Sequence, residues 1–231
     1  MPLDRSVISG LPAFAGLGGS DLDAILVGAR SSRFSKDSEV FAQGAEARSF
    51  FLLLSGHIRV VRNTPDGHQV IARYISEGEL FGIAVAMGLK IYPASAIAAV
   101  DCVVLTWPNS VWSDLQTRFP TFGANAYRTI GSRLQDTQAQ VMEMSTKQVE
   151  QRIANALLRI VGQSGRKTEE GIEIDFPISR QDIAEMTGTT LHTVSRLLSA
   201  WESEGIVRSG RQKVTVTDPH RLMLLAESQQ K

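Results

Sequence analysis

Cysteine is nearly absent from this sequence, since Cys102 is the only one among 231 residues. A single thiol excludes disulfides within the chain and metal sites that take several thiolates from one chain. It also excludes a four-cysteine iron–sulfur cluster built by one copy. We therefore expect no disulfide framework, no iron–sulfur cluster and no metal site.

Long apolar runs and an excess of one charge are also missing. No stretch approaches the length of a membrane span, and the first residues, MPLDRSVISGLPAFAGLG, lack the basic start and apolar core of a secretory signal. The 24 basic residues balance 24 acidic ones, so no charged tail points to nucleic acid. A few well-placed cations would still suffice for phosphate contacts. These features favour a cytoplasmic protein with no membrane partner.

Groupings typical of catalysis are lacking as well. The four histidines are scattered, at His57, His68, His192 and His220, and no phosphate-binding loop or pairing of nucleophile and base is recognisable. We therefore expect that the chain is not an enzyme.

What the N-terminal half does contain is a pattern of short strands. Ser32–Trp107 is rich in Val, Ile, Phe and Tyr, and glycines interrupt it at intervals. Pro65-Asp66-Gly67 lies between two apolar runs and predicts a hairpin, because proline presets φ and glycine accepts φ > 0. A β-roll or barrel follows. A short helix over Ser20–Arg30, capped by Ser20, is expected before it.

A long helix is predicted from Pro120, which suits the first position of a helix. It carries one narrow apolar stripe, which is typical of a two-stranded coiled coil and predicts a homodimer. The alternative is that the stripe packs on the chain's own β-domain. The expected domains are a sensor at 1–119, a dimerisation helix at 120–145 and a third domain at 146–231. The stripe consists of Phe122, Ala126, Ile130, Leu134, Val141 and Met144.

The third domain contains a helix-turn-helix pattern, preceded by a polar, glycine-bounded stretch, QSGRKTEEG, that is expected to be a loop. Ser179 and Asp182 have the spacing of a capping box, and Gly188 ends the first helix where φ > 0 is wanted. Thr189-Thr190 begins a second helix that closes at Gly205. The following segment, GIVRSGRQKVTV, predicts a two-stranded wing with its turn at Ser209-Gly210.

The second helix has one side that its core does not use. Its apolar residues are expected inside, whereas His192, Ser195 and Arg196 share the opposite face at positions i, i+3 and i+4. Such a face is often merely solvated, but here it follows a complete helix-turn-helix pattern. We therefore predict that these three residues read base edges in a major groove. The residues expected inside are Leu191, Val194, Leu197, Leu198 and Trp201.

Phosphate contacts are predicted around that face. Arg208, Arg211 and Lys213 of the wing supply cations, and the N-termini of the two helices supply N–H groups and hydroxyls. A different class of function remains open, in which a β-roll binds a small molecule and the C-terminal helices dock a protein. The predicted phosphate-binding residues outside the wing are Ser179, Arg180, Gln181, Thr190 and Thr193.

Nearly the whole chain resembles the Crp/Fnr family of bacterial transcription regulators. FFLLLSGHIRVVRNTPDGHQVIARYISEGELFG resembles the family's β-roll, and ISRQDIAEMTGTTLHTVSRLLSAWESEGIV resembles its DNA-binding signature. The resemblance implies an α+β fold: a cyclic-nucleotide-binding-like β-roll (jelly roll), a long coiled-coil dimer helix and a winged helix-turn-helix. It also implies a homodimer that binds palindromic double-stranded DNA and contacts RNA polymerase. Family members typically carry Glu-x-x-Ser-Arg or Glu-x-x-Gly-Arg; Ser195-Arg196 match, but His192 replaces the glutamate, so the base it reads stays open.

The sensor half departs from the family's best-known members. Members that bind cyclic AMP place Gly-Glu after a Phe-x-Gly turn and Arg-Ser about ten residues later. This chain has Gly82-Ile83 at the first place, and it has no arginine between Arg73 and Arg118. A buried phosphate without its guanidinium is costly, so cyclic AMP is not expected. In the haem-containing carbon monoxide sensor, cysteine and histidine follow the corresponding turn, where this chain has Gly82 and Ala84.

The segment TTLHTVSRLLSAWE is similar to that of the subgroup of regulators that govern nitrite and nitric oxide reductase genes in denitrifying bacteria. That similarity implies a response to nitric oxide under low oxygen, with haem as a candidate cofactor. His57 and His68 are the sensor-domain imidazoles that could hold it, although a solvated histidine is the commoner interpretation beside a turn. Pro2 is a further candidate ligand, and Cys102 is expected to be a small buried hydrophobe.

Overall fold

The computed structural model describes residues 8–227, so Pro2 lies outside the described residues. The chain divides into two compact units: unit 1 comprises Met1–Asn63 and Tyr74–Asp136, and unit 2 comprises Thr64–Arg73 and Thr137–Lys231. The division falls inside one long helix, α4 (Pro120–Thr146), whereas domain boundaries at 119 and 145 were expected. The predicted start of that helix at Pro120 is confirmed.

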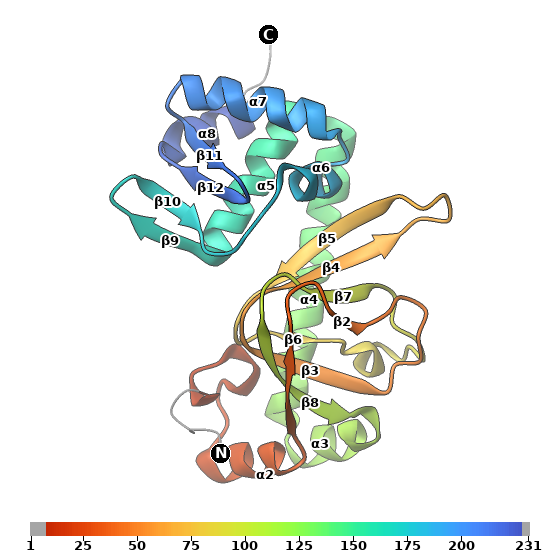
Figure 1. Ribbon diagram of the computed structural model, residues 1–231. Coiled ribbons are helices and arrows are strands. Elements are labelled where there is room, and N and C mark those ends of the chain that lie inside the picture. Colours follow the sequence, from red (N-terminus) through yellow and green to blue (C-terminus); the bar gives the residue numbers. More distant parts are fainter. Residues whose placement is uncertain (1–7, 228–231) are drawn as a thin grey trace. The chain divides into compact units, whose positions relative to one another are not determined.

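Two four-stranded sheets form a β-roll that belongs to unit 1 except for residues 69–73 of one strand, which fall in unit 2 (Figure 1). In the first sheet β1 (Arg30–Phe34), β8 (Cys102–Pro108), β3 (Ser49–Ser55) and β6 (Leu80–Phe81) lie in that order. In the second sheet the order is β2 (Glu39–Phe41), β7 (Ser95–Ala98), β4 (Ile58–Asn63) and β5 (Gln69–Ile75). Short single turns η1 (Pro12–Phe14), η2 (Ala84–Met87) and η3 (Asn109–Val111) complete the unit together with α2 (Gly19–Val27) and α3 (Trp112–Arg118).

The predicted hairpin and its glycines are confirmed. The turn between β4 and β5 closes through Gly67, whose φ is 85° and whose N–H donates to the Thr64 carbonyl at 2.9 Å. Gly56 has a φ of 97°, and a Cβ there would lie 2.6 Å from the Asp101 carbonyl oxygen. The backbone at this second turn therefore requires glycine for its conformation and for the space beside it.

The first helix begins differently from the prediction. Gly18, not Ser20, occupies the N-cap of α2, and no side chain caps it. The helix also ends at Val27, before Gly28, so that Arg30 already belongs to β1. The backbone N–H groups of the first turn therefore lack the serine cap that the sequence pattern indicated.

The helices of unit 1 pack on the first sheet around Trp107. Its ring stacks on Phe50 at a centroid distance of 5.3 Å, and its Nε1 donates to the Ile25 carbonyl at 2.9 Å. Phe122 and Ala126, on the first turns of α4, are fully buried in this same cluster, and Ile130 packs partly against it. This part of the apolar stripe therefore serves the chain's own core, and the assignment of Phe122 and Ala126 to a dimer interface is wrong.

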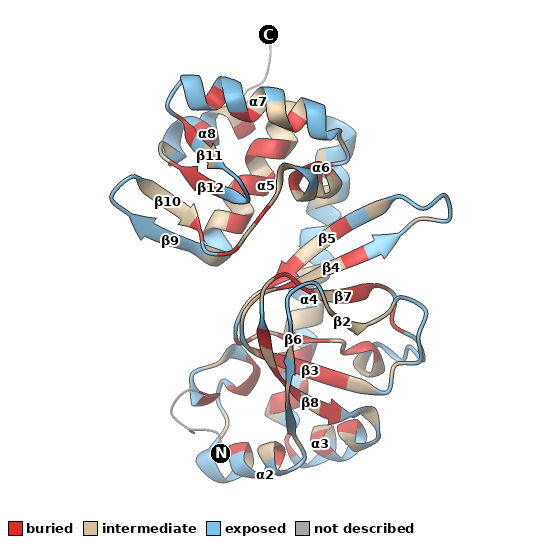
Figure 2. Ribbon diagram, viewed as in Figure 1, coloured by how far each residue is buried: buried red, intermediate tan, exposed pale blue. Residues whose placement is uncertain are grey.

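Beyond Ile130 the stripe on α4 is exposed. Leu134 is 58% exposed and Val141 59%, and Met142 and Met144 are also largely accessible. Figure 2 shows the change along α4 from buried to exposed residues. Among the described residues, the second half of the stripe is thus the part left for another chain to cover.

Unit 2 combines helices with a third four-stranded sheet. The helices are α5 (Val149–Ser164), α6 (Arg180–Thr187), α7 (Leu191–Ser203) and α8 (Pro219–Glu227). The sheet order is β11 (Val207–Gly210), β12 (Lys213–Val216), β10 (Gly171–Ile174) and β9 (Gly165–Thr168). The segment expected to be a polar loop forms β9 and half of a hairpin, and α8 has no counterpart in the prediction. None of the helices within residues 8–227 has the length and apolar character needed to cross a membrane.

Candidate nucleic-acid interface

Local hydrogen bonds build the helix-turn-helix of α6 and α7. The Ser179 side chain accepts from the Asp182 backbone N–H at 3.0 Å, and the Asp182 carboxylate accepts from the Ser179 N–H at 2.7 Å. The predicted capping box is thereby confirmed. Gly188 follows α6 with a φ of 60°, and Thr190 caps α7 by accepting from the Thr193 N–H at 3.2 Å.

The inner face of α7 is fixed by burial. Val194 and Leu198 are fully buried, and Trp201 is buried while its Nε1 donates to Glu150 on α5 at 3.1 Å. His192 and Arg196 on the other side are exposed, and Ser195 between them is half-buried. Buried and exposed residues alternate along α7 in Figure 2. The three predicted base-reading residues therefore lie together on an accessible face.

Leu191 does not belong to that inner face. It was expected inside, but its side chain is 47% exposed. Leu191 is the first residue of α7, so the turn of helix that would cover it is missing on its N-terminal side.

A hollow of about 440 Å³ lies beside the start of α7. The predicted phosphate-binding residues Ser179, Arg180 and Gln181 line it from the N-terminus of α6, and Arg211 lines it from the wing. Unpaired backbone N–H groups and a partial positive charge at a helix N-terminus favour an anion. The remaining lining residues are Leu191, Ser209, Gly210 and Gln212.

Arg180 also ties this hollow to the wing. Its Nη2 donates to the Ser209 hydroxyl at 3.0 Å, and the Ser209 N–H donates to the Glu202 carboxylate of α7 at 3.1 Å. The start of α6, the end of α7 and the first wing strand are thus linked through side chains. The linkage fixes the wing relative to the helix that carries His192 and Arg196.

The turn of the wing lies two residues later than predicted. β11 runs through Gly210, and the chain reverses at Arg211-Gln212, where Gln212 has a φ of 57°. Arg211 is thereby placed at the exposed tip, whereas Arg208 and Lys213 are paired strand residues.

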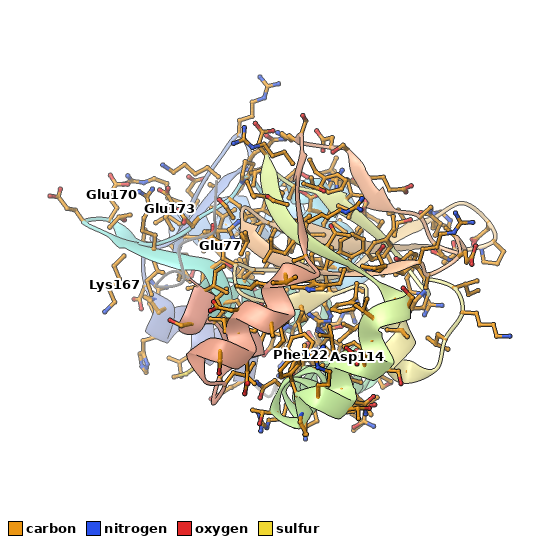
Figure 3. All side chains as sticks on the ribbon, turned by 90° about the horizontal axis from the view of Figure 1, so that it is seen from below. Glu77, Asp114, Phe122, Lys167, Glu170 and Glu173 are labelled. Carbon is orange, nitrogen blue, oxygen red and sulfur yellow. The ribbon has the colours of Figure 1, made fainter. Side chains whose placement is uncertain are left out.

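Arg208 and Lys213 are engaged by carboxylates of the neighbouring hairpin. Arg208 contacts Glu170, and Lys213 Nζ lies 2.7 Å from the Glu173 carboxylate, which Arg166 also approaches at 3.0 Å. Hydrogen bonding from Lys213 lowers the pKa of Glu173, so this carboxyl is ionised at neutral pH. Figure 3 shows Glu170 and Glu173 on this hairpin. We refer to Arg166, Glu170, Glu173, Arg208 and Lys213 as the wing ion-pair cluster.

The end of α4 is joined to the helix-turn-helix within unit 2. Arg159 of α5 donates to both carboxylate oxygens of Glu143 at 2.8 Å. Arg152 donates to the Thr187 carbonyl at the end of α6 at 3.0 Å, and a Cβ on Gly188 would lie 3.3 Å from Met144. Met144, predicted for the dimer interface, therefore lies beside the turn between the two helices.

Inside the β-roll, aromatic rings occupy the second core. Phe41 stacks on Tyr92 at 3.9 Å and on Phe51 at 5.6 Å, and Phe81 joins them. The Tyr92 hydroxyl donates to the Ser49 carbonyl at 2.6 Å, so its polar end is satisfied. No arginine lies between Arg73 and Arg118 to pair a phosphate. The stretch between Arg73 and Arg118 therefore offers a cyclic phosphate no guanidinium with which to pair.

The sensor-domain histidines and the cysteine have ordinary structural surroundings. The His68 side chain is 81% exposed and lies 3.4 Å from Asp66. His57 accepts from the Ala99 N–H through its backbone carbonyl, at 2.8 Å. Cys102 is buried, and its Sγ donates to the Val100 carbonyl at 3.1 Å. Among the described residues, no three His, Cys, Asp or Glu side chains gather as metal ligands would.

Cys102 is therefore expected to be unreactive in the folded protein. Burial raises the pKa of its thiol, which lowers the thiolate fraction at any pH near neutrality. At pH 8 we expect alkylation by iodoacetamide to be slower by about ten-fold or more than in urea-unfolded protein. Mass spectrometry would follow the rate, and native protein that reacts as fast as unfolded protein would contradict the assignment.

Two features of the site were missed from the sequence. Leu191 was counted among the core residues because it continues the apolar spacing of α7, and only its place at N1 hinted at exposure. The engagement of Arg208 and Lys213 depends on Glu170 and Glu173, which seemed to lie in a loop. The glycine-bounded, charged stretch could have been read as a hairpin, and this is the signal that was overlooked.

Comparisons with known proteins agree with this arrangement. The family described as cyclic nucleotide-binding domain matches residues 31–118, and the Crp-like helix-turn-helix domain matches residues 151–225. The chain is 28% identical to the cyclic AMP receptor protein of Thermus thermophilus over 211 residues, 91% of this chain and 94% of that protein. It is 26% identical to the transcriptional activator protein FnrA of Stutzerimonas stutzeri over 220 residues, 95% of this chain and 90% of that protein.

Solved structures share the fold. FixK2 from Bradyrhizobium japonicum superposes with a TM-score of 0.77 at 22% identity, covering 87% of this chain and 99% of that one. The expected α+β fold, with its β-roll, long helix and C-terminal helix-turn-helix, is confirmed. The relatives are transcription regulators and not enzymes. With both domains in their order and one face of α7 exposed, the chain belongs to the Crp/Fnr family of DNA-binding transcription regulators.

Proposed function

We propose that α7 enters the major groove of a palindromic operator, where Arg196 reads a guanine and Ser195 and His192 contact neighbouring base edges. Arginine can donate two parallel hydrogen bonds to guanine O6 and N7. The observation that carries the proposal is the exposure of His192 and Arg196, with half-buried Ser195 between them, opposite a fully buried face of α7. The adjoining phosphates are held by Ser179, Arg180, Gln181, Thr190, Thr193 and Arg211.

Selection of binding sites from a library of random DNA duplexes tests this proposal. Because Crp/Fnr regulators act as dimers, we expect an inverted repeat whose half-sites lie about one helical turn, roughly 34–36 Å, apart. Enrichment of no sequence would contradict a base-reading role for α7. Enrichment of a single half-site would contradict the dimeric arrangement.

The wing ion-pair cluster limits what the wing contributes to phosphate binding. We propose that Glu170 and Glu173 compete with DNA phosphates for Arg208 and Lys213, leaving Arg211 as the wing's available cation. Arg208 and Lys213 then contact phosphates only after leaving these ion pairs, in which both cations are more than half exposed, and ion pairs open to solvent are individually weak.

The substitution Glu173→Gln should therefore strengthen DNA binding. We expect about two- to five-fold tighter binding to any duplex, the scale of one exposed ion pair, and a steeper dependence of affinity on salt. Fluorescence anisotropy on the selected operator and on a scrambled duplex would measure both changes. Glu39→Gln, at an exposed position on β2 of the β-roll, is the control. Unchanged or weaker binding by Glu173→Gln would reject the competition.

We propose that dimerisation uses the exposed half of the stripe, Leu134, Val141 and Met144, with Ile130 at its edge. The end of this helix is joined to the helix-turn-helix by the ion pair of Glu143 with Arg159 and by Met144, which lies beside Gly188. A change in how two copies of α4 pack would therefore reorient α7. Such coupling needs only that the signal favour one of two ways in which the two copies of α4 pack.

We propose that the signal is nitric oxide or low oxygen and that the protein activates denitrification genes with RNA polymerase in the cytoplasm. The support is the similarity of the recognition helix to that subgroup and the lack of an arginine between Arg73 and Arg118 with which a cyclic phosphate could pair. Absorbance of anaerobically purified protein, before and after nitric oxide, tests it. A Soret band that shifts would support haem, with His57 and His68 as the candidate ligands. No band after haem reconstitution, together with operator affinity unchanged by nitric oxide, would reject this signal.

A further inference from the structure

Leu191 is an apolar side chain on a surface whose other members are polar. It is 47% exposed at the first position of α7, whereas Val194 and Leu198 of the same helix are fully buried. Around the hollow beside it, the lining is otherwise made of hydroxyl, amide, guanidinium and backbone groups. An isolated exposed leucine is common on protein surfaces, so its location decides what it means.

That location is the N-terminal end of the base-reading face. Leu191 and Ser195 are four residues apart, and His192 and Arg196 form the next pair along the same side of the helix. The Thr190 cap, with its hydroxyl 3.2 Å from the Thr193 N–H, holds the first turn in helical form and so fixes the position of Leu191. In helix-turn-helix proteins the N-terminal residues of the second helix contact base edges.

We propose that Leu191 recognises the 5-methyl group of a thymine in each half-site. In the major groove the thymine methyl is the apolar feature of the base-pair edges, and a leucine side chain has no hydrogen-bonding group with which to read anything else. Contact would remove both apolar surfaces from water. The inference rests on the proposed function, because it requires α7 to lie in the major groove.

Replacing thymine by deoxyuridine tests the inference, since only the methyl group is removed. An operator selected by the wild-type protein would be substituted at one thymine pair at a time, at symmetric positions. We expect one position at which the substitution weakens wild-type binding by about four-fold per half-site, the equivalent of one methyl group taken out of water. Leu191→Ala should bind the thymine and deoxyuridine operators equally at that position.

Two further variants control for indirect effects. Leu191→Met keeps an apolar side chain and should remain sensitive to the methyl group, and Leu224→Ala removes a leucine that is 51% exposed on α8 and should behave as wild type. Tolerance of deoxyuridine at every position by the wild type, or undiminished sensitivity in Leu191→Ala, would overturn the inference while leaving operator binding intact. Failure to select any operator would instead reject the proposed function.

Discussion

Leu134→Glu is expected to convert the dimer into a monomer and to lower operator affinity by at least about 100-fold. Leu134 is 58% exposed on α4, beyond the part of the helix that the chain's own core covers. In a two-fold interface the substitution would place two carboxylates close together in an apolar seam, where unpaired charges are costly. A monomer binds one half-site at a time. It therefore loses the gain in affinity that a dimer obtains by binding both half-sites at once, which is typically 10²–10⁴-fold.

Sedimentation velocity and operator binding would be measured on the same preparations. Val27→Glu is the matched control, because Val27 is 86% exposed on α2, and it should remain dimeric with unchanged affinity. Ile130 is a poorer choice for this test, since it also packs against the core of unit 1 and its substitution would disturb folding. A Leu134→Glu protein that stays dimeric would show that the exposed stripe is not the interface.

Arg196→Ala is expected to remove sequence selectivity while leaving general DNA binding nearly intact. A bidentate contact from arginine to guanine contributes about 1–3 kcal/mol of discrimination, so each half-site should lose roughly 5- to 150-fold in preference for its guanine. Arg196 is exposed and takes no part in the core, so the variant should unfold at the wild-type temperature. Anisotropy with the selected operator and with variants of each base pair would locate the lost preference.

Comparison with Arg211→Ala separates base reading from phosphate contact. Arg211 is at the exposed tip of the wing, and its loss should weaken all duplexes similarly and reduce the slope of log affinity against log salt by about one. Arg118→Ala, in unit 1, should change neither property. If Arg196→Ala weakened every sequence equally, as Arg211→Ala is expected to do, Arg196 would be a phosphate contact.

Many features that depend on near neighbours in the chain followed from the sequence, although the cap of α2 and the position of the wing turn did not. The capping box of Ser179 and Asp182, the left-handed Gly188 and the hairpin at Gly67 each involve residues within a few positions of one another. The face formed by His192, Ser195 and Arg196 likewise needs only the helical repeat and the burial of Val194 and Leu198. Hydrogen bonding and steric restrictions at this range act in almost any tertiary context.

Contacts between distant segments were decided only by the tertiary structure. A periodic stripe on α4 cannot show which part meets Trp112 and Phe50 and which part stays exposed, because both parts have the same spacing. The engagement of Lys213 by Glu173 joins residues 40 positions apart across neighbouring strands. Tyr92 stacks on Phe41, which lies 51 positions earlier in the chain. Pairing and burial at such separations depend on strand order and register, to which composition and local periodicity give no access.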